Sequence, residues 1–136
     1  MQKIQLIFLF TINLTVFGQL INKKDVYGKW TVQRVIDKPK KPQFKPLIKG
    51  FENSNFFFSE NGSFELTTSS KSPLFEMITN MTKGTKWKLL QNKPFIKIGN
   101  EKDRYSIIGI SITEINGVEI FCLDESGIKL EMKKAE

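Results

Sequence analysis

The sequence predicts an all-β protein, an antiparallel up-and-down barrel of about eight strands. Between residues 55 and 133, short runs of β-favouring residues alternate with short turn signals. Two of these signals are the pairs Asn61-Gly62 and Asn116-Gly117, and an Asn-Gly pair tolerates positive φ at both central positions of a hairpin turn. Several strands joined by tight turns at near-regular spacing are typical of an antiparallel meander that closes into a barrel or folds into a sandwich.

The expected strands follow one another along most of the chain. The first is long, Tyr27–Ile36, and the others are shorter. These others are expected at Asn55–Glu60, Ser63–Thr68, Thr85–Gln91, Pro94–Gly99, Arg104–Ile115, Val118–Leu123 and Ile128–Lys133. One segment is ambiguous, because the apolar residues of Leu74–Met81 fit a helical turn about as well as a strand.

A segment rich in proline and lysine separates the first two strands. Asp37–Pro46 contains three prolines and four lysines. Because proline lacks the N–H group that a sheet ladder needs, this segment is expected to be a loop or an edge segment. Leu47 and Ile48 are expected to fold back from it over apolar surface.

Alternation within the strands predicts which side chains fill the core. An antiparallel sheet wrapped around a single core needs one apolar and one polar face per strand. The residues expected to face inward are Trp30, Val32, Phe56, Phe58, Phe64, Leu66, Trp87, Leu89, Ile96, Ile98, Ile110, Ile112, Ile120, Cys122, Ile128, Leu130 and Met132. Eight strands enclose an interior that side chains can just fill, or that can hold one small ligand.

Residues 1–18 have the layout of a secretory signal peptide. Lys3 supplies a positive charge, Ile4–Phe17 is mostly apolar, and cleavage is expected between Gly18 and Gln19. An uncleaved anchor is the alternative, although the apolar run is short for a membrane span. We expect an exported protein, periplasmic or secreted, that has one β-barrel domain, residues 19–136, and no stable membrane span after cleavage.

The amino-acid composition argues against enzymatic chemistry. The chain contains no histidine, so no Ser-His-Asp or Cys-His arrangement can form, and zinc, haem and copper lose their commonest ligand. No calcium-loop spacing, phosphate-binding glycine loop or paired cysteine motif is present. The single cysteine, Cys122, is expected to be a small buried hydrophobic residue. We therefore expect a protein that is not an enzyme and that uses neither a cofactor nor a metal.

Several short motifs carry a family resemblance. Tyr27-Gly28-Lys29-Trp30 resembles the Gly-x-Trp motif that opens the first strand of lipocalins. A phenylalanine-rich hairpin, Phe56–Phe64, and a later tryptophan strand, Thr85–Leu90, resemble the small secreted lipocalin-like domains of Bacteroidota. In order and spacing, the resemblance covers residues 25–134.

The resemblance implies roles for several residues. Gly28 and Trp30 would seal the closed end of the barrel, and Asp37–Gly50 would be a lid-like loop at its open end. Lipocalins also place an arginine over the first-strand tryptophan. No arginine follows Arg104 in this chain, so Lys129 or Lys133 would take that place, without the planar stacking of a guanidinium.

Two functions are compatible with these expectations. The first is a non-enzymatic carrier or sensor that holds a small hydrophobic ligand inside the barrel, with the proline-lysine loop controlling entry. The residues expected to contact the ligand are Phe56, Phe58, Phe64, Trp87 and Leu89. Aromatic side chains that simply fill the core are the structural alternative.

The second function is an interaction module with a filled core. Its basic loop, Lys38–Lys49, would bind an anionic envelope component or a partner protein. The candidate contacts are Lys38, Lys40, Lys41 and Lys45. The net charge of +7 favours anionic partners, but export argues against nucleic acid. A solvated loop that binds nothing is the alternative to this function.

Overall fold

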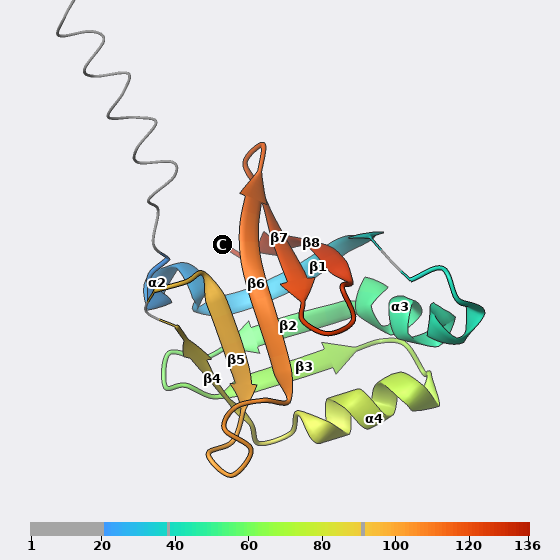
Figure 1. Cartoon of the computed structure of the whole chain (residues 1–136), viewed down its shortest axis with the longest axis horizontal. Coiled ribbons are helices and arrows are strands. Elements are labelled where there is room, and N and C mark those ends of the chain that lie inside the picture. The colour runs from blue at the N-terminus through green and yellow to red at the C-terminus, as the bar shows by residue number, and fades with distance from the viewer. Residues whose placement is uncertain (1–20, 38, 91) are drawn as a thin grey trace, which may run out of the picture.

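The computed structural model describes residues 21–37, 39–90 and 92–136. The predicted signal peptide, residues 1–18, lies outside this part of the chain, and so does Lys38. Within the described part, eight antiparallel strands form one sheet in the order β3-β2-β1-β8-β7-β6-β5-β4, which curls into a nearly closed barrel (Figure 1). The predicted fold class, an all-β up-and-down barrel, is confirmed.

The strands and helices have the following bounds. The strands are β1 (Gly28–Asp37), β2 (Ser54–Phe58), β3 (Phe64–Thr68), β4 (Lys86–Leu89), β5 (Phe95–Gly99), β6 (Ile108–Ile115), β7 (Val118–Leu123) and β8 (Lys129–Lys134). The helices are α2 (Lys23–Val26), the short 3₁₀ helix η1 (Pro42–Phe44), α3 (Lys45–Glu52) and α4 (Pro73–Met81).

The barrel closes between β3 and β4 only at the end nearest α2. There Ser63 and Lys86 form an isolated bridge. The amide of Trp87 donates to the carbonyl of Gly62 at 2.9 Å, and the amide of Phe64 donates to the carbonyl of Thr85 at 3.0 Å. Toward the other end, the chain between the two strands forms α4, which packs against β3.

Helix α2 covers the end of the barrel where β1 begins. Nε1 of Trp30 donates to the carbonyl of Val26 at 2.8 Å, and both side chains are buried. Nζ of Lys134 lies 5.8 Å from the centre of the Trp30 ring, and it donates to the carbonyls of Lys24 and Asp25.

The lysine over Trp30 is therefore Lys134, and the expectation of Lys129 or Lys133 is wrong. The reason is the two-residue period of a strand. Lys134 has the same parity as Leu130 and Met132, which are buried in the core. Lys129 and Lys133 have the opposite parity and are exposed on the outer face.

The alternation that predicts the core is correct for most strands but wrong for β7. Phe121 and Leu123 belong to the core cluster, whereas Ile120 is buried outside it and Cys122 is only half-buried. Residues 120–123 are all apolar, so the sequence pattern cannot show which face is internal. Strand pairing decides, because Phe121 lies opposite the buried residues Ile112 and Leu130.

The proline-lysine segment contains helices where a loop or edge segment was predicted. Pro42 and Pro46 lie in the first turns of η1 and α3, where a missing N–H costs no helical hydrogen bond. The expectation for the residues after it is correct, because Ile48 is buried and Leu47 packs against the core. The ambiguous segment 74–81 belongs to a helix, α4, in which Ser72 accepts a hydrogen bond from the amide of Phe75.

One turn prediction is correct, and two others need correction. Asn116 and Gly117 both have positive φ, 53° and 81°, as predicted for a tight hairpin. In the other pair only Gly62 has positive φ, because the hairpin is wider and the amide of Ser59 donates to the carbonyl of Ser63. Strand β6 begins at Ile108 rather than at Arg104, since positive φ at Arg104 places it in a turn.

Close packing of α3 on α4 depends on Gly50. The rings of Phe51 and Phe75 meet edge to face, with centroids 4.8 Å apart. A Cβ atom at Gly50 would lie 2.7 Å from Cβ of Phe75 and would overlap its ring. Only glycine therefore permits this approach of the two helices.

We expect Gly50→Ala to destabilise the protein. Alanine favours an α-helix over glycine by about 1 kcal/mol, but overpacking a buried contact costs about 1–3 kcal/mol. The free energy of unfolding, measured by urea denaturation, should therefore fall by about 1 kcal/mol. Asn80→Ala on the exposed part of α4 is the control and should change stability by less than about 0.5 kcal/mol. A Gly50→Ala protein as stable as the wild type would contradict this packing.

Candidate functional site

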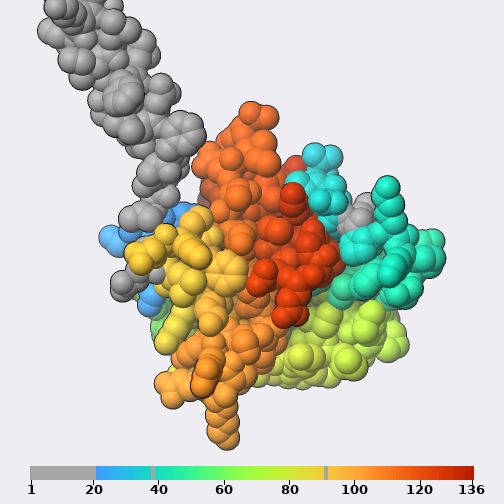
Figure 2. Space-filling view, in the orientation of Figure 1, coloured from blue at the N-terminus to red at the C-terminus, as the bar shows by residue number. Residues whose placement is uncertain are grey.

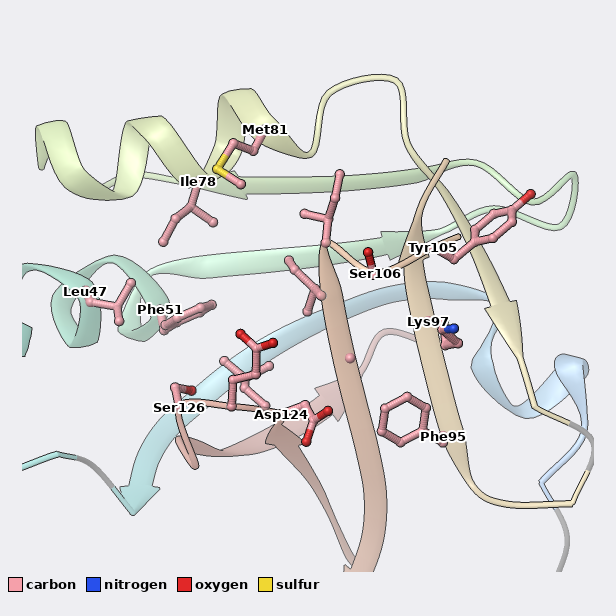
Figure 3. Close-up of a pocket in the computed structure, with 15 residues that line it drawn as sticks. Leu47, Phe51, Ile78, Met81, Phe95, Lys97, Tyr105, Ser106, Asp124 and Ser126 are labelled. Atoms are coloured by element: carbon pink, nitrogen blue, oxygen red, sulfur yellow. The ribbon is translucent and has the colours of Figure 1, made fainter. Parts of the chain in front are cut away.

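A cleft of about 370 Å³ lies at the end of the barrel that α3 and α4 cover. One wall consists of Leu47 and Phe51 from α3 and of Ile78 and Met81 from α4. The opposite wall is the turn between β7 and β8, which contributes Asp124, Glu125 and Ser126. Figure 3 shows the two walls facing each other across the start of β6.

Gly109, near the start of β6, forms the floor of this cleft. A Cβ atom there would lie 2.7 Å from Cζ of Phe95 and 3.2 Å from Cβ of Asp124. The amide of Asp124 also donates to the carbonyl of Gly109 at 2.8 Å. Because Gly109 has no side chain, the turn between β7 and β8 can approach β6 closely. The cleft continues over β6 to Phe95 and Lys97 on the outer side (Figure 3).

The turn before β6 forms the rim of the cleft through Tyr105 and Ser106. Oδ1 of Asp103 accepts hydrogen bonds from the amides of Asn100 and Ser106, at 2.9 and 3.3 Å. Nζ of Lys88 lies 4.4 Å from the centre of the Tyr105 ring. These contacts hold the rim on the side of the cleft away from the helices.

The five predicted ligand contacts lie outside this cleft. Phe56, Phe58, Phe64 and Trp87 are buried and pack on one another; the centroid of Phe58 is 5.2 Å from that of Phe64 and 5.5 Å from that of Trp87. Leu89 is half-buried and packs against the same core. As ligand contacts these residues remain a prediction, and a ligand could reach the four rings only by displacing them.

Three of the four predicted anion contacts lie together. Lys40, Lys41 and Lys45 line one hollow of about 880 Å³, which Lys49 also lines. The fourth, Lys38, lies outside the described residues. The ion pairs found in the described part are Arg34 with Glu131 and Lys129 with Asp37, so the four lysines of this hollow are not neutralised by a carboxylate there.

Only a weak signal in the sequence points to the cleft. Leu47 and Phe51 are four residues apart and Ile78 and Met81 are three apart, which is the spacing of one helix face. That spacing becomes informative only after both segments are known to be helical. Asp124 and Glu125 lie in the turn between β7 and β8.

The described residues contain neither a metal-binding cluster of side chains nor a helix suited to span a membrane. No group of three or more histidine, cysteine, aspartate or glutamate side chains in residues 21–37, 39–90 and 92–136 is placed to hold a metal ion. In the same residues, no helix has the length and apolar character needed to cross a membrane.

Comparison of the chain with protein-family models, with curated proteins and with solved structures found no match. The family resemblance therefore rests on the residues and the fold. The nearly closed eight-stranded barrel is consistent with the lipocalin-like fold that the Gly28 and Trp30 motif suggested.

Carboxylates gather at the end of the barrel opposite the cleft. Glu119 lies directly across from Glu114 in the pairing of β6 with β7, and Asp25 of α2 is nearby. Burial, and then repulsion from Glu114 and Asp25, raises the pKa of Glu119 above its ordinary value of 4.5.

We expect Glu119→Gln to stabilise the protein at neutral pH. Between pH 4.5 and the raised pKa, the folded state binds more protons than the unfolded state, so the free energy of unfolding falls as pH rises. Glutamine does not ionise, so the variant does not lose this part of the free energy of unfolding as pH rises. Urea denaturation should show a more stable variant at pH 7 and a smaller difference below pH 4.5. A stability gain that is largest in acid would contradict the assignment.

Proposed function

We propose that this protein is a non-enzymatic, exported lipocalin-like binding protein that holds a small hydrophobic ligand in the cleft between α3, α4 and the start of β6. One observation carries the proposal: a 370 Å³ cleft with apolar helical walls opens at the end of a barrel whose interior holds its own aromatic rings. Ligand pockets in proteins typically have volumes of about 300–1,000 Å³ and are lined mainly by apolar side chains.

The lining of the cleft suggests the kind of ligand. Leu47, Phe51 and Ile78 offer apolar surface on the helical side. Ser106 and Ser126 place hydroxyl groups on the strand side, where they can hydrogen-bond a polar group. A mostly apolar molecule with one polar end fits this arrangement.

The energetic cost of binding favours the cleft over the barrel interior. Phe56, Phe58 and Phe121 are in mutual contact and fully buried. Each aromatic pair contributes about 0.5–1.5 kcal/mol beyond simple burial, and a ligand among these rings would have to break several such pairs. Binding in the cleft breaks none of them.

Filling the cleft should block binding. We expect Ile78→Trp to weaken binding of a neutral apolar fluorophore such as Nile red by at least about tenfold, or about 1.4 kcal/mol. Ile115→Trp is the matched control, because Ile115 is 56% exposed and does not line the cleft. Fluorescence titration measures both affinities, and native mass spectrometry of the purified protein reports any ligand that stays bound.

The same titration can refute the proposal. Failure of the wild-type protein to bind any apolar probe, or equal losses in Ile78→Trp and Ile115→Trp, would count against a site in the cleft. If Phe58→Leu changed the affinity and Ile78→Trp did not, the ligand would instead lie among the predicted contacts inside the barrel.

A further inference from the structure

A concentrated positive charge lies beside α3. Lys40, Lys41, Lys45 and Lys49 line a single hollow, and Glu52 is the only acidic side chain among the described residues that line it. Such a cluster of like charges produces a positive potential that attracts anions over several ångströms.

An exposed apolar strip lies on the neighbouring helix. Leu74, Met77 and Met81 of α4 are 40%, 58% and 54% exposed, although they are among the larger apolar side chains. Their spacing of three and four residues places them on one side of the helix. Phe75 points away from this strip and is fully buried.

The lysine hollow and the apolar strip adjoin. Ser72 and Pro73, at the start of α4, line the hollow, and Leu74 follows them directly. Helices α3 and α4 also contact each other through Gly50 and Phe75. In Figure 2 the teal residues of α3 and the lime residues of α4 lie next to each other at one end of the molecule. We call these seven residues, four lysines and three apolar side chains, the helical surface.

We propose that the helical surface docks on an anionic lipid bilayer. The lysines would pair with lipid phosphates, and Leu74, Met77 and Met81 would enter the boundary between headgroups and acyl chains. Basic residues beside apolar side chains are the combination that holds a protein on a membrane without crossing it. The proposal does not depend on a ligand in the cleft.

The composition of the surface favours a bilayer over a soluble polyanion. The described residues that line the hollow include no arginine and no aromatic side chain, the groups that read phosphodiester chains and stack on bases. A hydrated polyanion would also leave Met77 and Met81 in water. A bilayer, which has an apolar layer beneath its negative charges, uses both parts of the helical surface.

Vesicle co-sedimentation tests this proposal. The wild-type protein should bind phosphatidylcholine vesicles that contain phosphatidylglycerol, bind pure phosphatidylcholine vesicles weakly, and lose binding as salt rises. Replacing Lys40, Lys41, Lys45 and Lys49 together with Gln should lower the affinity by at least about tenfold. All variants share one N-terminal segment, so any contribution of residues 1–20 is common to them.

Two further variants distinguish docking by the helical surface from an effect of net charge and from binding of a soluble polyanion. Replacing the exposed residues Lys86, Lys93, Lys102 and Lys133 with Gln removes the same charge elsewhere and should leave most of the binding. Met77→Gln should weaken binding to anionic vesicles about threefold to tenfold, because it removes an inserted apolar side chain. It should not change binding to dextran sulfate, a soluble polyanion.

Three results would overturn the proposal. The first is no preference for anionic vesicles at low salt. The second is an equal loss of binding in the two quadruple variants, which would show an effect of net charge alone. The third is binding to dextran sulfate as strong as binding to vesicles, together with no effect of Met77→Gln, which would identify a polyanion as the partner. Circular dichroism of each variant checks that the barrel is intact.

Discussion

The packing of aromatic rings across the barrel is the contact on which the rest of the structure depends. Phe121 of β7 lies 5.0 Å from Trp30 and 5.9 Å from Phe56, measured between ring centroids, so it joins the two halves of the sheet. Trp87 of β4 meets Phe58 of β2 at 5.5 Å, across the seam where only a few backbone hydrogen bonds join β3 to β4. With a single cysteine the chain cannot form an internal disulfide, so this apolar core must provide the stability.

A filled core determines where binding surfaces can form. Rings occupy the interior, and the cleft, the lysine hollow and a third hollow beside α2 lie at the ends of the barrel and around the helices. At the α2 end, Lys134 lies over Trp30 and donates to the carbonyls of Lys24 and Asp25. At the other end α3 packs against β1 and α4, and α4 packs against β3. Leu47, Phe51 and Ile78 on their inner sides pack on the core and form the cleft wall, and their outer sides carry the lysines of α3 and the exposed Met77 of α4.

The same pair of helices therefore serves both proposals. Leu47 and Phe51 of α3 face the cleft, while Lys45 and Lys49 of the same helix line the hollow. This division is possible because residues two apart on a helix point in very different directions. The acidic side chains Glu114 and Glu119 lie at the opposite end of the barrel, in a hollow that Lys24, Lys133 and Lys134 also line.

Local sequence patterns specify those parts of the structure that depend on neighbouring residues. Alternation located the strands, Asn116-Gly117 specified its hairpin, and most inward-facing residues followed from parity, because these features are local. Tertiary structure decided the rest. Strand pairing chose the inner face of β7, where residues 120–123 are apolar on both sides. Contact with the core made helices of a proline-rich segment and of an ambiguous one, since short helices are marginal in water without an apolar surface to cover. The cleft and the helical surface each combine segments far apart in the chain, and no local pattern encodes that proximity.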